Sequence, residues 1–174
     1  MTNTLSSADR IQILEDKENI RETVYRYAWL LDKKKWDNLI ELFYEDAILI
    51  VHPYGAHKGK DEIRSFFFNI LDKRPPGFHY VSNIIVTVSG NEGKSDSFWH
   101  STGEREGKSM LVAGFYHHEL IKPEDGNWYI KKKEIFIDYN VPLEVGWGGL
   151  KGKDRIWGDS QGRYAPPKNL NKIT

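Results

Sequence analysis

Two residues stand out for the chemistry that they could perform together, an aspartate and a histidine 47 positions apart. Asp32 follows an amphipathic helical pattern, so its carboxylate lies at the negative end of the helix dipole, which typically costs ~0.3–1 kcal/mol. That cost favours a compensating partner. His79 opens a β-rich run just after a double-proline turn. A carboxylate that holds one imidazole nitrogen leaves the other as a general base, so we expect Asp32 and His79 to form a catalytic dyad.

Each of these residues also has a simpler interpretation. Asp32 could be a solvated aspartate in the last turn of its helix, and His79 a structural strand histidine. Tyr27 precedes Asp32 by five positions, which is about 140° around an ideal helix. Both side chains therefore reach one cavity only if the helix end lies across its mouth or is distorted.

Further polar and aromatic side chains are candidates for contacts with a substrate. His100 shares its strand parity with Phe98 and Thr102, so it faces either the cavity or the outside. The substrate-binding candidates that the sequence predicts are His52, Tyr54, His100 and Tyr116.

The sequence predicts neither a metal site nor a cofactor. His117 and His118 are adjacent, so on a strand they point to opposite faces and do not ligate one metal together. There is no HExxH motif, no cysteine and no glycine-rich fingerprint for a nucleotide. We therefore expect chemistry performed by side chains alone.

Composition narrows the possible partners. The chain of 174 residues carries 25 basic and 25 acidic side chains, so no net charge attracts nucleic acid or an acidic membrane. No apolar run approaches the ~20 residues of a membrane span, and the N-terminus lacks a signal-like apolar region. We expect a cytoplasmic protein whose partner is a small hydrophobic molecule.

The order of predicted elements indicates an α+β fold. Helical spacing covers residues 11–31, 36–43 and 60–71, and β-rich runs cover 47–51, 78–89, 95–106, 110–121 and 128–139. About three helices would pack on a strongly curved, mainly antiparallel sheet, in a cone-shaped barrel that encloses a pocket. We expect one domain over residues 1–145, followed by an extended arm over 146–174 that acts as a lid or an oligomer contact.

Several short motifs in this order resemble the SnoaL-like branch of the nuclear-transport-factor-like superfamily, over roughly Glu15 to Leu143. The match is densest in residues 27–36, YAWLLDKKKW, and extends to 55–59 (GAHKG), 79–83 (HYVSN) and 139–143 (YNVPL). These segments are most similar to scytalone dehydratase, bile-acid dehydratases and hexachlorocyclohexane dehydrochlorinase.

The resemblance implies a cofactor-independent lyase and a homo-oligomer, either a dimer or a trimer. In such enzymes the histidine removes a proton, the aspartate orients it, and water or halide departs from the neighbouring carbon. His79 would then be the base, Asp32 its orienting partner, and Tyr27 a hydroxyl that polarises a carbonyl or assists the leaving group. The superfamily also contains isomerases, cyclases and non-catalytic binding subunits, so these remain alternatives.

Overall fold

The computed structural model of the protein describes residues 5–52 and 54–148, and in that part of the chain it contains three helices and six strands. The helices are α1 (Ser7–Asp32), α2 (Trp36–Ile40) and α3 (Gly59–Leu71). The strands are β1 (Phe43–Val51), β2 (Gly55–Lys58), β3 (Phe78–Ser89), β4 (Glu92–Arg105), β5 (Lys108–Ile121) and β6 (Tyr129–Pro142). The predicted α+β class is confirmed, whereas most of the predicted arm, from residue 149 onward, lies outside the described residues.

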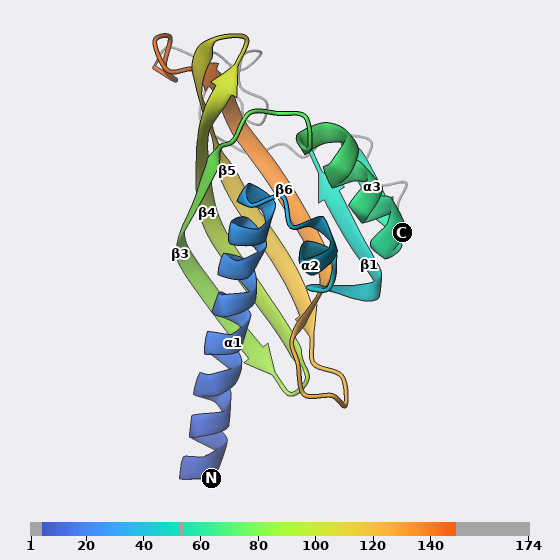
Figure 1. Cartoon of the computed structure of the whole chain (residues 1–174). Coiled ribbons are helices and arrows are strands. Elements are labelled where there is room, and N and C mark those ends of the chain that lie inside the picture. The colour runs from blue at the N-terminus through green and yellow to red at the C-terminus, as the bar shows by residue number, and fades with distance from the viewer. Residues whose placement is uncertain (1–4, 53, 149–174) are drawn as a thin grey trace.

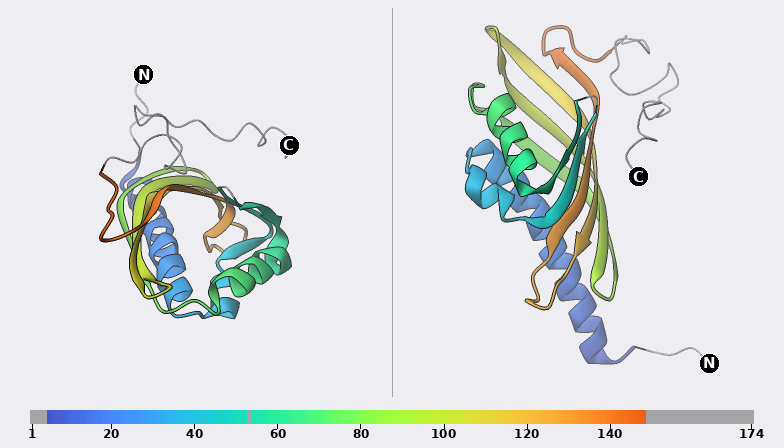
Figure 2. Two further views of the ribbon diagram at one scale, coloured as in Figure 1. Left: turned by 90° about the horizontal axis from the view of Figure 1, so that it is seen from above. Right: turned by 90° about the vertical axis from the view of Figure 1, so that its right-hand side faces the viewer.

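The strands form one sheet in the order β2-β1-β6-β5-β4-β3. Every neighbouring pair is antiparallel except β1 and β6, which run parallel. The sheet curves into an arc whose concave side faces the helices, as the view from above shows (Figure 2). The predicted cone shape is confirmed, but the sheet is open, with β2 and β3 at its edges.

The start of β1 and the whole of β2 differ from the predicted elements. Phe43 was expected to end the second helix, but it begins β1 and pairs with Ile130 of β6. An apolar residue at this position fits the periodicity of a helix as well as that of a strand. The pairing of β1 with β6 makes it part of a strand. β2 is only four residues long and has no apolar alternation, so the sequence pattern gave no signal for it.

The helices cover the concave face of the sheet and bury its core (Figure 1). α1 begins with a capping box in which Ser6 and Asp9 bind each other's backbone N–H groups. Its buried stripe packs on β3, while α3 packs on β1. Because α1 ends over the sheet, Asp32 is carried to the same end of the fold as the first residues of β3. No helix in the described residues is long and apolar enough to span a membrane.

Candidate active site

A cavity of about 400 Å³ lies between the helices and the concave face of the sheet. Its wall is mostly apolar and aromatic. The apolar and aromatic residues that line it include Leu31, Trp36, Val51, Phe66, Phe67, Ile70, Trp99, Val112, Ile135 and Ile137. Asp32, His79, Tyr27, Tyr54 and Tyr116 also line it, so five of the seven predicted site residues meet in one cavity.

Asp32 and His79 are joined by two hydrogen bonds. The Nδ1 atom of His79 lies 2.6 Å from Oδ1 of Asp32, and the backbone N–H of His79 donates to Oδ2 at 2.8 Å. A carboxylate only accepts, so this contact places a ring proton on Nδ1, and in the neutral imidazole the lone pair is then on Nε2. The side chain of Asp32 is 14% exposed and that of His79 is 21% exposed. The pair is thus largely shielded from water while it lines the cavity.

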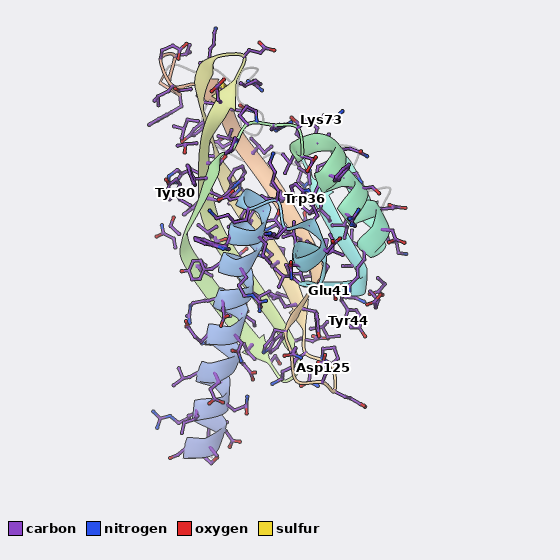
Figure 3. The ribbon with its side chains drawn as sticks, in the orientation of Figure 1. Trp36, Glu41, Tyr44, Lys73, Tyr80 and Asp125 are labelled. Atoms are coloured by element: carbon purple, nitrogen blue, oxygen red, sulfur yellow. The ribbon has the colours of Figure 1, made fainter. Side chains whose placement is uncertain are left out.

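The segments next to Asp32 and His79 are tied to each other as well. Lys34, two residues after Asp32, donates from Nζ to the backbone carbonyls of Asp72 and Arg74, in the segment that leads into β3. The indole N–H of Trp36 donates to Asp72 Oδ1 at 2.9 Å. Trp36 lies beside the C-terminal end of α1, and Lys73 lies just beyond the C-terminal end of α3 (Figure 3). These contacts fix the end of α1 against the start of β3, and so they fix the geometry of the dyad.

Tyr27 is a lining residue of the cavity that carries a buried hydroxyl. Its ring packs edge-on against Phe43, Phe67 and Tyr116, and its oxygen has no hydrogen-bond partner among the described residues. Burial and the negative charge of Asp32 raise the pKa of Tyr27 well above the ordinary value for tyrosine. The phenol therefore stays protonated and can donate a hydrogen bond. A buried polar group without a partner is unfavourable. Such an unpaired group is typical of a site where a ligand supplies the missing hydrogen bond.

The other two tyrosines line the cavity in different ways. Tyr116 is buried and stacks on Trp99, with ring centroids 5.1 Å apart and planes at 10°. Burial is also the main reason that the pKa of Tyr116 lies well above its usual range. Tyr54 is 52% exposed and stands at the rim. Tyr116 thus shapes the floor, and Tyr54 lies where a ligand would enter.

His52 and His100 do not line this cavity, which corrects their prediction as substrate contacts. His100 stacks on Tyr80 at 4.8 Å, and Tyr80 projects away from the helices (Figure 3). The inward positions of β4 are the odd-numbered ones, including Trp99, so His100 faces outward. His52 is buried but stacks on Phe136 and lies 3.7 Å from Glu134. Phe136 alternates with two cavity residues of β6, which places this contact on the opposite side of the sheet.

Among the cavity residues that were not predicted as site residues are one aromatic and two polar residues, Trp99, Ser101 and Asn140. Trp99 lies with its ring centroid 5.7 Å from that of His79 and forms the wall beside the dyad. Ser101 and Asn140 add polar groups to the lining. Strand parity was the available signal for Trp99, because a residue next to an outward His100 must point inward. The position of Asn140 follows a register shift between β5 and β6 that no local pattern shows.

Comparison with known proteins agrees with this fold. The SnoaL-like domain matches residues 12–134, more than half of the chain. An uncharacterized protein of Mycobacterium tuberculosis is 23% identical over 127 residues, which cover 70% of this chain and 85% of that protein.

Solved structures provide a second comparison. A crystal structure of hexachlorocyclohexane dehydrochlorinase LinA-type3 from Novosphingobium barchaimii aligns with a TM-score of 0.71 and 22% identity, covering 93% of this chain and all of that one. A proposed scytalone dehydratase from Novosphingobium aromaticivorans aligns with a TM-score of 0.68 and 22% identity, covering 79% and 97%. At such identities the likeness establishes the fold only. Together with the domain match, it shows that the chain belongs to the SnoaL-like family.

Proposed function

We propose that this protein is a cofactor-independent lyase that eliminates water or hydrogen halide from a small hydrophobic substrate. Nε2 of His79 takes a proton from a carbon next to a carbonyl or another activating group. The electrons of that C–H bond form the new double bond, and the bond to the leaving group on the neighbouring carbon breaks. Halide leaves as the anion, and His79 then releases its proton to solvent; a departing hydroxyl group instead receives the proton back from His79 and leaves as water.

One observation carries this proposal: Asp32 binds Nδ1 of His79, while Nε2 remains available in an apolar cavity. In this arrangement the carboxylate fixes the tautomer that makes Nε2 basic, and it stabilises the imidazolium that forms when the proton is taken. The cavity wall excludes much of the water that would compete for the base. The same pair on an open surface would lack these properties.

Tyr27 supplies the electrophilic part of the proposed site. Its phenol is protonated and has no partner among the described residues, so it can donate to a carbonyl oxygen or to a departing hydroxyl. A preorganised donor of this kind stabilises charge that develops in the transition state. We assign Tyr27 this role, His79 the role of base and Asp32 that of orienting partner.

The dimensions and lining of the cavity support a substrate class. Its volume of about 400 Å³ lies in the range of ~300–1,000 Å³ that is typical of sites for small organic ligands. The aromatic wall suits a cyclic or polyketide-like molecule that carries a carbonyl and a β-leaving group. The family resemblance further supports a homo-oligomer, and light scattering of the purified protein would determine the number of its subunits.

Mass spectrometry of the purified protein with a panel of apolar β-hydroxy-carbonyl and halogenated compounds tests this function. Wild-type protein is expected to release water or hydrogen halide from a panel member, and His79→Gln is expected not to. His117→Gln is the matched control, because His117 also binds an aspartate at 2.8 Å but is outside the cavity.

Two other outcomes of this mass-spectrometry experiment would indicate a function other than elimination. A new product with the same mass as the substrate would indicate isomerisation or cyclisation by the same base instead of elimination. Binding of panel compounds without any conversion, in wild type and variant alike, would favour a non-catalytic binding protein.

A further inference from the structure

A row of three buried polar side chains crosses the concave face of the sheet, next to the cavity but outside its lining. Ser95 of β4, His118 of β5 and Lys133 of β6 are direct partners in the strand register. Ser95 Oγ lies 3.0 Å from His118 Nδ1, and Lys133 Nζ lies 2.6 Å from His118 Nε2. Lys133 and His118 are 0% exposed. The proposed elimination chemistry uses none of the three.

The amine of Lys133 also contacts both tyrosines of the cavity floor. Nζ lies 3.9 Å from the ring centroid of Tyr27 and 3.4 Å from that of Tyr116. The two rings stand at 83° to each other, so the nitrogen occupies the corner between them. An aromatic face is negative and attracts N–H groups. The nitrogen thus has three neighbours, two ring faces and one imidazole nitrogen, which equals the number of N–H donors of an ammonium group.

This burial has a cost that packing alone does not explain. Desolvation lowers the pKa of Lys133 well below that of an ordinary lysine, and no carboxylate in the described part of the chain opposes the effect. The pKa of His118 is lowered in the same way, mainly by its burial. An apolar side chain of similar length would fill the same space without desolvating an amine. Buried amines are normally paired with a carboxylate, and Lys133 departs from this rule in the described residues. Such a departure beside a cavity is typical of a functional position.

We propose that Lys133 is a positioning residue for the cavity: anchored by His118, its amine holds the rings of Tyr27 and Tyr116 and so directs the Tyr27 hydroxyl toward the substrate. The consequence for turnover rests on the proposed lyase function, whereas the control of the two rings does not. The titratable groups in contact with the amine are His118, Tyr27 and Tyr116, and Asp32 acts on both tyrosines through its charge.

Lys133→Met tests this proposal, because methionine keeps a long unbranched side chain and removes the nitrogen. Lys131→Met is the matched control: Lys131 lies 5.0 Å from the ring centroid of Tyr44, but its side chain is 38% exposed and Tyr44 does not line the cavity. Lys133→Gln, which keeps a donor for His118, is the second variant should methionine prevent folding. Thermal unfolding identifies which variants fold.

The first measurement is NMR of protein with ¹³C-labelled tyrosine rings, with signals assigned from Tyr27→Phe and Tyr116→Phe. In the wild type, raising the pH is expected to shift both ring signals as Lys133 loses its proton, with a midpoint below that of free lysine. Lys133→Met should abolish this titration and Lys131→Met should keep it. Ring signals and titration unchanged in a folded Lys133→Met protein would overturn the proposal.

The second measurement is steady-state kinetics with any substrate that the panel provides. Misdirection of the Tyr27 hydroxyl is expected to lower kcat on the order of 10–100-fold, with little change in KM. An unchanged kcat in Lys133→Met would overturn the positioning role. If the wild type has no lyase activity but the tyrosine titration is present and depends on Lys133, the ring contact stands and the lyase function fails.

Discussion

The carboxylate of Asp32 binds His79 through two different donors, the ring Nδ1 and the backbone N–H, at 2.6 and 2.8 Å. A second aspartate–histidine pair in the same protein, Asp96 and His117, has a comparable ring contact of 2.8 Å. Asp96 is exposed, however, and neither residue lines the cavity. The two pairs share their chemistry and differ in their surroundings, which provides an internal control for the dyad.

Asp32→Asn is expected to reduce kcat/KM on the order of 10²–10⁴-fold, the usual contribution of general base catalysis. An amide can donate to Nδ1, which moves the ring proton to Nε2 and removes the base. We expect the variant to stay folded, with a stability loss of about 1–3 kcal/mol from the altered buried hydrogen bonds. Kinetics and thermal unfolding measure the two effects.

Asp96→Asn is the control for this substitution, since it makes the same chemical change in the exposed pair. It should leave kcat/KM within about twofold of the wild type, because surface substitutions have small effects. Equal losses in the two variants would mean that Asp32 has no special role, and the dyad assignment would then be abandoned.

Tyr27→Phe is expected to separate stability from activity. The hydroxyl is buried without a partner among the described residues, so its removal should leave the melting temperature equal or higher. The same change removes the donor that would stabilise developing charge, and kcat should fall on the order of 10²-fold. Tyr25→Phe, on an exposed position of α1, should change neither quantity. A clear drop in stability with full activity would contradict the role of Tyr27.

The contact between Asp32 and His79 was predicted from their residue types, their places in the elements and the family resemblance, and most of the fold was predictable from local patterns. Asp32 and His79 lie at the ends of strongly periodic elements, so their approximate positions followed once the helices were expected to cover one face of the sheet. The face of β4 was harder to assign, since both of its sides carry a large aromatic residue. Phe98 is mostly exposed and Trp99 is buried, and this difference depends on the neighbouring strands.

Lys133 shows why the rest was not predictable. It follows Lys131 and Lys132, and a run of three lysines is most often a solvated surface. Only its parity with Ile135 and Ile137, which line the cavity, places it inward. The parallel pairing of β1 with β6 is likewise a long-range contact without a sequence signal. Such features depend on tertiary packing, which overrides local propensity.

Gly114→Ala is expected to be strongly destabilising, because β5 and β6 approach closely at the register shift beside this residue. A Cβ atom at Gly114 would lie 1.9 Å from the backbone oxygen of Phe136, which is too short for any real contact. The strands would have to separate where they form the cavity wall. We expect a loss of about 3 kcal/mol or more in the free energy of unfolding, measured by denaturant titration.

Gly148→Ala is the matched control, because no heavy atom of residues 5–52 and 54–148 would lie within 4 Å of its added Cβ. This variant should unfold like the wild type, within about 0.5 kcal/mol. If Gly114→Ala were equally neutral, the close approach of β5 and β6 would not exist in solution, and the shape of the cavity wall would need revision.

Glu134 is expected to make the stability of the protein depend on acidic pH. The ring of His52, whose Nε2 lies 3.7 Å from the carboxylate, and the nearby Lys132 lower the pKa of Glu134 from 4.5 to about 2, against the opposing effect of burial. Because the pKa is lower in the folded state than in the unfolded state, the folded protein is stabilised above pH 4.5. That stabilisation is lost as the pH falls from 4.5 toward 2, and it amounts to about 3 kcal/mol in total.

Glu134→Gln should therefore flatten the decline in unfolding free energy between pH 5 and 2, whereas the exposed Glu22→Gln should not. Parallel declines for the wild type and Glu134→Gln would show that the contacts of Glu134 with His52 and Lys132 contribute little, and the acid sensitivity would then arise from other carboxylates.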